Sequence, residues 1–485
     1  MNVFIMQFMK GPWKAGERKA LKKLSEYVEY DGLGLASLVK RREVKPSELI
    51  SCAIQAIEKA NPKLNAVVRR LDAMAKKTAR GDLPRGAFTG VPFLLKDLTH
   101  SLAGVPTDCG SRFFKGWTRK YDSEMVKRWK AAGFVIVGKT NTPEAGSSGS
   151  CEPVANGATH NPWKLGYSPG GSSGGSAAGV AAGMTPVAHA NDGGGSIRIP
   201  ASACGLVGLK PSRGRTSYAP DWGELWNGMA IEGVVSRTVR DTAASLDVMW
   251  QPAVGDPYFA APPRRPYGAE VGAPVEKLRV GFSTAAPRGS AMHGECIKGV
   301  RKTAALLESL GHRVEEAAPK FDISRLEEAW GIIFQANEAW AFLDYAKITG
   351  RKISNKLVEA NNLWLVEEGQ KHSAIDLLKA IHDMHAVSRQ FAQFFEKYDI
   401  WLTPTLGSPP PKHGYLFADQ NPDVFFERLM EFIPITPIYN ATGNPAITLP
   451  LHWSRNGLPV GISIFEISSA LYKPACIMDA RSELP

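Results

Sequence analysis

The chain has 485 residues, of which 44% are hydrophobic and 22% charged, an average composition for a folded protein. No stretch approaches the roughly 20 consecutive apolar residues of a membrane-spanning helix, and the first residues lack the charged leader and cleavage site of a signal peptide. We therefore expect neither a membrane protein nor a secreted one, and the length suits one large α/β unit as well as several domains.

The net charge is +11, and a basic cluster between residues 9 and 23 carries six Lys or Arg against one Glu. No RNA-binding signature or helix-turn-helix pattern accompanies it. We interpret residues 1–30 as a solvated and partly disordered arm, and expect no nucleic-acid or membrane partner.

The six cysteines offer no metal-binding or disulfide pattern, because no two are closer than 42 residues. Reduced thiols in a cytoplasmic compartment are the default for such spacing. The cysteines are Cys52, Cys109, Cys151, Cys204, Cys296 and Cys476.

Helices and buried strands alternate in the first part of the chain. Residues 45–61 predict an amphipathic helix, with Pro46 in its first turn. A short apolar run over 90–98 predicts a buried strand, and a helix over 123–133 precedes another buried strand over 134–141. This alternation predicts an α/β fold whose sheet is covered on both faces.

The second half continues the pattern after a Pro- and Ala-rich surface connection over 255–276. Strands are predicted at 277–283, 398–406 and 444–451, with a helix-turn-strand over 296–317 and mostly helix over 322–398. The helical region holds five large aromatic residues, which we interpret first as core packing and second as the lining of a cavity. These residues are Trp330, Phe334, Trp340, Phe342 and Trp364. No solenoid repeat is present, and we expect a single domain over 31–485.

Two stretches of small residues lie about twenty residues apart: PGGSSGGSAAG (169–179) and NDGGGSIRIP (191–200). A phosphate-binding loop is excluded for the first, because Ser176 stands where the lysine belongs. A nucleophile elbow with Ser172 or Ser173 lacks the buried strand that should precede it. A flexible linker remains an alternative for the first stretch taken alone.

A catalytic interpretation uses both stretches. Residues 172–184 continue as a helix of small residues, and a short strand over 185–192 leads into Gly193, Gly194 and Gly195. Successive glycines allow backbone N–H groups to converge, as an oxyanion hole requires. Ser196, directly after them, is then the candidate nucleophile, with Ser172 close by.

A serine nucleophile needs a base, and two residue types offer one. His189 lies only seven residues before Ser196 on the entering strand, and we interpret it as a structural histidine. Lys96 ends a buried apolar run, where burial lowers the pKa of a lysine and makes it a proton acceptor. A surface lysine at a strand end is the alternative.

The set Lys96, Ser172 and Ser196, with GGSSGG and GGGSIRIPASACGLVGLKPSRGR, closely resembles the amidase signature family. KTNTPE, NPW and GLPVG extend the resemblance from about residue 35 to 464, with a signature core over about 86–250. The resemblance implies that Ser196 is the nucleophile, that Ser172 bridges after a cis peptide bond, and that Lys96 is the base.

The same resemblance implies a mixed sheet of about eleven strands with helices on both faces. It places the oxyanion hole at the N–H groups of Gly193, Gly194, Gly195 and Ser196, and Gly146 beside the acyl site. It implies no metal and no organic cofactor. Asp192 and Arg198 flank the nucleophile, and we expect them to hold its loop by charge-assisted hydrogen bonds.

FTGVPFLLKDLT and PVAHAND resemble the branch that contains the nylon-oligomer (6-aminohexanoate cyclic dimer) hydrolases, near amidases that accept anilides and carbamates. The resemblance therefore implies a cytoplasmic amide hydrolase (EC 3.5 class) acting on a small or medium amide or carbamate. A homodimer is left open. The residues after 464 depart from the family's usual ending.

Three alternatives remain at this stage. One is the glutamine-amidase subunit of a tRNA-dependent amidotransferase, which would purify with a second subunit. Another is a non-catalytic binding protein on an amidase fold, against which the intact Lys96, Ser172 and Ser196 argue. The third is an α/β-hydrolase esterase with an elbow serine.

Overall fold

One mixed sheet of eleven strands organises the computed structural model, which describes residues 24–258 and 260–465. The strands lie in the order β1-β3-β2-β4-β6-β5-β10-β11-β9-β7-β8. They are β1 (Val67–Arg70), β2 (Pro92–Lys96), β3 (Val135–Thr140), β4 (Val187–Asp192), β5 (Val207–Lys210), β6 (Ile231–Ser236), β7 (Arg279–Phe282), β8 (Arg313–Glu316), β9 (Ile400–Pro404), β10 (Ala446–Trp453) and β11 (Pro459–Phe465). The predicted α/β class and the expected eleven strands are confirmed.

The sheet is parallel in two places and antiparallel between them. Strand β2 pairs in parallel with both β3 and β4, and β7 pairs in parallel with β8 and β9. The intervening strands from β4 to β9 run antiparallel to their neighbours. Because β2 and β4 are parallel neighbours, their carboxyl ends, at Lys96 and Asp192, lie at the same edge of the sheet.

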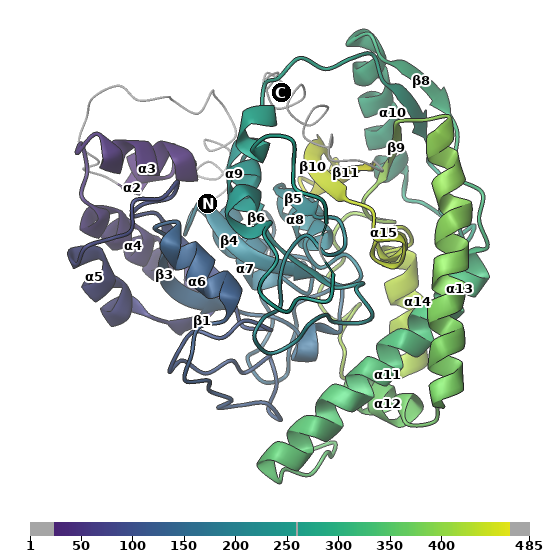
Figure 1. Cartoon of the computed structure of the whole chain (residues 1–485), viewed down its shortest axis with the longest axis horizontal. Helices are drawn as coiled ribbons and strands as arrows, with labels where there is room; N and C mark the ends of the chain where they lie inside the picture. The colour runs from purple at the N-terminus through teal and green to yellow at the C-terminus, as the bar shows by residue number, and fades with distance from the viewer. Residues whose placement is uncertain (1–23, 259, 466–485) are drawn as a thin grey trace.

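Helices cover both faces of the sheet and extend beyond one end of it (Figure 1). They are α2 (Leu24–Tyr27), α3 (Gly32–Lys40), α4 (Pro46–Leu64), α5 (Asp72–Arg80), α6 (Glu124–Ala131), α7 (Gly174–Ala181), α8 (Arg198–Cys204), α9 (Val239–Met249), α10 (Gly294–Ser309), α11 (Ile323–Thr349), α12 (Ala360–Gly369), α13 (Ala374–Ala392), α14 (Pro422–Phe432) and α15 (Thr436–Thr442), with short 3₁₀ turns η1 (Glu144–Gly146), η2 (Tyr267–Glu270) and η3 (Gln393–Glu396). The purple helices α3–α5 lie at one end of the molecule, and the long green helices α11 and α13 lie at the other.

Local sequence signals explain where these helices begin and end. Helix α4 starts with Pro46 at its first position, and the Glu48 carboxylate accepts the Lys45 N–H at 2.6 Å. The helix ends at Asn65 in the left-handed conformation. Its predicted apolar face, which includes Ile54, is buried.

Helix α7 shows why the first small-residue stretch is not a linker. Every residue from Gly174 to Ala181 is buried, and the helix contacts β2, β4 and β6. A Cβ added to Gly175 would lie 2.5 Å from the Asn141 nitrogen, so only glycine fits there. The small side chains let the helix approach the sheet closely.

The predictions for the two ends of the chain, a basic arm and an atypical ending, concern residues that the structure describes only in part. The basic cluster between residues 9 and 23 and the residues after 465 lie outside the described residues. Residues 24–30, predicted to belong to the arm, pack against the fold instead. Tyr27 is buried, and its hydroxyl donates to the Met184 carbonyl at 3.0 Å.

Among the described residues, none of the helices is both long and apolar enough to cross a bilayer.

Candidate active site

Lys96 lies at the carboxyl end of β2 and is completely buried. Its Nζ lies 2.6 Å from Ser172 Oγ and 2.5 Å from Asn191 Oδ1. Burial lowers the pKa of Lys96 to about 7, although the nearby Glu232 carboxylate acts in the opposite direction. The predicted base therefore sits where a lysine can be neutral near neutral pH, and the surface alternative for Lys96 is wrong.

Ser172 follows a cis peptide bond from Gly171 and is 2% exposed. A Cβ on Gly171 would lie 2.3 Å from the Ser150 carbonyl oxygen, so this loop is built on glycine because backbone packs against backbone. No strand leads directly into Ser172, which lies in a loop before α7. The elbow expected of an α/β-hydrolase esterase is not formed.

The two small-residue stretches contact each other at two places. The Ser173 hydroxyl donates to the Asn191 carbonyl at 3.4 Å. At the other end, a Cβ on Gly170 would lie 2.8 Å from Pro200 Cα. Ser196 lies between these two contacts along the second stretch, half-buried in the turn before α8.

The glycine run is closed in by side chains on both sides. A Cβ on Gly193 would lie 2.2 Å from the Trp226 ring, and one on Gly195 would lie 2.5 Å from Thr436 Oγ1. The Thr436 hydroxyl also donates to the Gly194 carbonyl at 2.8 Å. These contacts fix the backbone whose N–H groups were predicted to form an oxyanion hole.

One of the predicted oxyanion donors is already in use. The Gly195 N–H donates to Asp192 Oδ1 at 2.7 Å, so it is not available to a substrate and this part of the prediction is corrected. The N–H groups of Gly193, Gly194 and Ser196 donate to no acceptor in the part of the chain that the structure describes. Three of the four predicted donors thus remain.

Asp192 and Arg198 hold the loop, as expected from the sequence. The Arg198 guanidinium donates to both Asp192 oxygens, at 2.8 and 2.9 Å, and both side chains are completely buried. Burial alone would raise the pKa of Asp192, but Arg198 and Asn440 bring it to about 2. The Asn440 amide also donates to the Asp192 carbonyl at 2.9 Å.

Gly146, at the end of η1, lies beside the bridging serine. Its φ is +77°, and a Cβ there would lie 3.3 Å from Ser172 Oγ and 2.7 Å from Leu98. A side chain at this position would crowd Ser172. This contact agrees with the expectation that Gly146 lies near the acyl site.

The His189 ring bonds Lys96 and Glu232 rather than either candidate serine. Its Nδ1 accepts the Lys96 backbone N–H at 3.3 Å, and its Nε2 lies 2.5 Å from Glu232 Oε2. Burial lowers the pKa of His189 to about 4. Its contacts support the interpretation of His189 as a structural residue.

A cavity of about 220 Å³ adjoins the glycine run. Its walls include Trp330, Phe334, Trp364 and Phe426, and every lining residue falls between residues 288 and 438. Ring atom Cζ2 of Trp330 lies 3.3 Å from the position of a Cβ on Gly194, so this indole separates the cavity from the catalytic loop.

Three of the five aromatic residues singled out in the sequence thus line the cavity. The other two do not: Trp340 is 51% exposed, and Phe342 is buried against Phe113. Core packing, the first interpretation of these residues, holds for Phe342 and also for Phe334, which is 4% exposed although it borders the cavity.

Sequence reasoning missed several residues of the site. Asn191 adjoins Asp192 in the motif and lies on β4. A polar side chain in a strand predicted to be buried could have indicated a residue of the site. Thr436 and Asn440 gave none, because more than 200 residues separate them from the loop that they bond.

Comparisons with known proteins show which family and fold the chain is similar to. A family model described as Amidase matches residues 48–465. The 6-aminohexanoate-cyclic-dimer hydrolase of Paenarthrobacter ureafaciens is 37% identical over 448 residues, covering 90% of each chain. An acylamidase of Rhodococcus erythropolis is 32% identical over 441 residues, covering 89% of this chain and 90% of that protein.

A solved structure of 6-aminohexanoate cyclic dimer hydrolase superposes with a TM-score of 0.88 at 35% identity, covering 93% of this chain and 97% of that one. The family match spans most of the chain, and the fold agrees with it. The chain therefore belongs to the amidase signature family, and it is a hydrolase of amide C–N bonds.

Proposed function

We propose that Ser196 attacks the carbonyl carbon of a small or medium amide, and that Ser172 and Lys96 carry the proton. The observation that carries the proposal is the buried contact of 2.6 Å between Lys96 Nζ and Ser172 Oγ. A lysine whose pKa is lowered to about 7 accepts a proton from a neighbouring hydroxyl far more readily than an exposed lysine.

The proton moves in two linked transfers. As the Ser196 oxygen bonds to the carbonyl carbon, its proton passes to Ser172 Oγ, and the Ser172 proton passes to Lys96 Nζ. The negative charge that develops on the carbonyl oxygen is stabilised by the N–H groups of Gly193, Gly194 and Ser196.

The relay then runs in reverse to release the amine. The Lys96 ammonium returns a proton to Ser172, and Ser172 protonates the leaving nitrogen as the C–N bond breaks. An acyl group remains on Ser196. Water, deprotonated through the same two groups, hydrolyses this ester and restores the free serine.

The cavity supports a substrate with an apolar or aromatic portion beside the scissile bond. Its walls are mainly aromatic and aliphatic, with one ion pair, Arg288 to Glu327 at 3.1 Å. The buried indole nitrogen of Trp330 has no hydrogen-bond acceptor among the described residues. A second carbonyl or a carbamate oxygen on the substrate would supply that acceptor.

The relatives support a chemical class for the proposed substrate. Hydrolysis of the 6-aminohexanoate cyclic dimer, named for relatives at 37% identity, fits an apolar cavity with an unpaired donor. Anilides are the next candidates, in view of the acylamidase relative, and aryl carbamates carry the same groups. The proposal includes a cytoplasmic location, which the five free cysteines among the described residues support.

The test measures amine release from a cyclic 6-aminohexanoate dimer, an anilide, an aryl carbamate and a primary aliphatic amide, with an ester followed by its alcohol. We expect Ser196→Ala to lose about 10⁴-fold or more in kcat. Ser173→Ala is the matched control, because this neighbouring serine contacts the Asn191 carbonyl and takes no part in the relay. It should hydrolyse the same substrates at close to the wild-type rate.

The opposite pattern would count against the proposal. Activity that survives Ser196→Ala but is lost in Ser173→Ala would move the nucleophile to the first stretch. The result would instead support an amidotransferase subunit if no substrate of the panel is hydrolysed and glutamine releases ammonia in the presence of a co-purified second subunit. Sedimentation of the purified chain would separate a monomer from a homodimer.

A further inference from the structure

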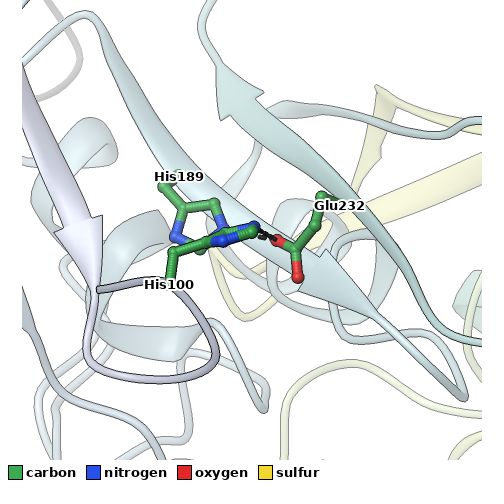
Figure 2. Close-up of side chains that lie close together, drawn as sticks. All are labelled: His100, His189 and Glu232. Carbon is green, nitrogen blue, oxygen red and sulfur yellow. Dashed lines mark hydrogen bonds and ion pairs between the residues drawn. The ribbon is translucent and has the colours of Figure 1, made fainter. Parts of the chain in front are cut away.

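Three buried titratable side chains, His100, His189 and Glu232, form a cluster (Figure 2) that contacts the proposed base through His189. His100 follows β2, His189 belongs to β4 and Glu232 to β6, so three neighbouring segments of the sheet region contribute one residue each. One ligand atom from each lies within 4.8 Å of the others. Histidine and carboxylate are common metal ligands, so the cluster raises the question of a metal site.

The hydrogen bonds argue against a metal. Because His189 Nδ1 accepts the Lys96 backbone N–H, a neutral His189 carries its proton on Nε2. That Nε2 points at Glu232 Oε2, 2.5 Å away, and it donates there. A metal on Nε2 would need the opposite tautomer, whose Nδ1 proton would face the Lys96 N–H. The cluster is therefore a hydrogen-bonded network around a carboxylate.

We propose that Glu232 is a positioning residue for the Lys96 base, acting through Asn191 and His189. The inference rests on the role proposed above for Lys96. The two oxygens of Glu232 face different groups. Oε2 faces the two histidines, with His100 Nε2 at 3.4 Å. Oε1 faces Thr99 Oγ1 at 3.1 Å and Asn191 Nδ2 at 3.4 Å.

The Glu232 carboxylate determines which way the Asn191 amide points, together with the Thr99 hydroxyl, which donates to Glu232 and accepts from Asn191 Nδ2 at 3.2 Å. An ionised carboxylate only accepts hydrogen bonds, so the Asn191 NH₂ group turns toward it. The Asn191 oxygen then faces Lys96 Nζ, where it accepts a hydrogen bond at 2.5 Å. With one of its N–H bonds directed at Asn191, a neutral Lys96 amine can turn its lone pair toward Ser172, as proton transfer requires.

The His189 contact holds the other end of the same residue. Glu232 fixes the tautomer of His189, and His189 in turn accepts the backbone N–H of Lys96. The Lys96 side chain and backbone are therefore both oriented by one carboxylate, which acts through Asn191 and His189 and does not line the cavity.

The charge of Glu232 also matters, because a buried anion favours the protonated lysine. Glu232 opposes the effect of burial on the pKa of Lys96. The hydrogen bonds and charges of the histidines overcome the effect of burial and hold the pKa of Glu232 well below its usual range. The other titratable groups facing Lys96 or Glu232 are Cys109, Cys151, Asp192 and Tyr218.

The test is the pH dependence of the Glu232→Gln enzyme on the amide that the wild type hydrolyses best. A glutamine can present its NH₂ group to Asn191 and turn the Asn191 amide, so that a donor faces Lys96. We expect kcat on the plateau to fall about tenfold or more, with little change in KM. Because an anion is lost, the acidic limb of kcat/KM should move to lower pH.

Asp241→Asn is the matched control for removing a buried carboxylate. Asp241 is completely buried in α9 and accepts hydrogen bonds from the N–H groups of Gly32 and Leu33. Neither of these residues belongs to the proposed relay. This variant should lose stability while the position of the acidic limb stays at that of the wild type. A shift of the limb in both variants would overturn the proposal, because it would then be a general effect of destabilisation.

If Glu232→Gln does not fold, Asn191→Leu tests the same chain of contacts. It removes the acceptor of the Lys96 amine and should lower kcat with little change in KM. The positioning role would be overturned if the folded variants keep the wild-type kcat and the acidic limb of their kcat/KM profile stays at the wild-type pH. A stoichiometric metal ion that the wild type binds and Glu232→Gln loses would also overturn it.

Lys96→Met and Ser196→Ala separate this inference from the function on which it rests. If either of them keeps full activity, the proposed relay is wrong. If both are inactive while Glu232→Gln behaves as the wild type, the relay stands and only the role of Glu232 is wrong.

Discussion

Lys96 differs from a surface lysine because its strand ends inside the fold, where its side chain is completely buried. Burial makes the ammonium costly, and within residues 24–258 and 260–465 no carboxylate bonds Nζ to compensate for it. Asn191 instead offers a neutral acceptor. The residue is therefore held for proton transfer by uncharged partners, while the charge of the Glu232 carboxylate opposes the lowering of its pKa.

The first prediction concerns the pH dependence of the wild-type reaction. Lys96 must be neutral to accept a proton, and its pKa is lowered to about 7. We expect kcat/KM to be low under acidic conditions, to rise through about pH 7 and to level off above it. A pH series of initial rates, with circular dichroism at each pH to exclude unfolding, measures this. A rate that falls as the pH rises through neutrality would contradict a neutral-lysine base.

The second prediction concerns Arg198. Its removal leaves Asp192 as an uncompensated buried charge, because the guanidinium bonds both carboxylate oxygens. We expect Arg198→Met to lower the free energy of unfolding by about 3–5 kcal/mol, measured by urea denaturation. Catalysis should fall as well, because Asp192 also holds the Gly195 N–H.

Arg279→Met is the matched control for Arg198. Arg279 also bonds both oxygens of one aspartate, Asp399, but on the exposed surface. Solvent screens such a pair, so its loss should change the stability very little. Equal losses in the two variants would mean that burial does not decide the cost.

At the scale of elements, the catalytic loop and the cavity are built differently. The loop is held by backbone contacts at glycines, whereas the cavity is formed by large side chains from α11, α12, α14 and α15. Helix α11 contributes to both, because Trp330 faces Gly194 and also lines the cavity. Changes on α12 or α14 should therefore alter substrate preference more than chemistry.

The third prediction follows for α12. Trp364 lines the cavity and packs on Phe426 with ring centroids 4.9 Å apart. We expect Trp364→Ala to lower kcat/KM for substrates with a bulky apolar group by about tenfold or more, and to affect a small aliphatic amide much less. Parallel assays on both substrates measure the ratio.

Trp340→Ala provides the control for loss of an indole. Trp340 lies on α11 but is 51% exposed and does not line the cavity. Its removal should leave the substrate ratio unchanged. If both variants shift the ratio equally, the cavity is not the substrate pocket.

The elements near the active site were predictable from the sequence because their signals are local. Buried apolar runs indicated β2, β3 and β4, and the positions of Lys96, Ser172 and Ser196 followed from the motif. Asn440 and Thr436 were not predictable, because they reach the loop only after the chain has returned across the sheet. The Gly195 N–H was assigned to the wrong partner because the sequence does not show which way Asp192 turns.

At the scale of the whole molecule, the groups of the candidate site come from the middle of one half of the sheet. Strands β2, β4 and β6 are neighbours in the sheet and supply Lys96, Asn191 and Glu232. All residues of these three strands are buried. A site on such strands is kept rigid by the core itself.

The fourth prediction concerns hydrogen exchange of the native protein. Amides in β2, β4 and β6 should be among the slowest, because they open only with the core. The edge strand β8, which is largely exposed, is the internal comparison and should exchange much faster. Peptide-resolved mass spectrometry measures both. Exchange of β4 as fast as that of β8 would mean that the site opens locally.

The residues that line the cavity all fall between 288 and 438, whereas Lys96, Ser172, Ser196 and Glu232 all precede that segment. Apart from Thr436, which bonds the catalytic loop, the residues proposed for the reaction and those that line the cavity are therefore encoded in separate, consecutive portions of the gene. A random library confined to the later portion would sample new substrates while every copy kept the bond-breaking residues. An exchange of that portion between related enzymes would transfer a substrate preference in a single crossover region.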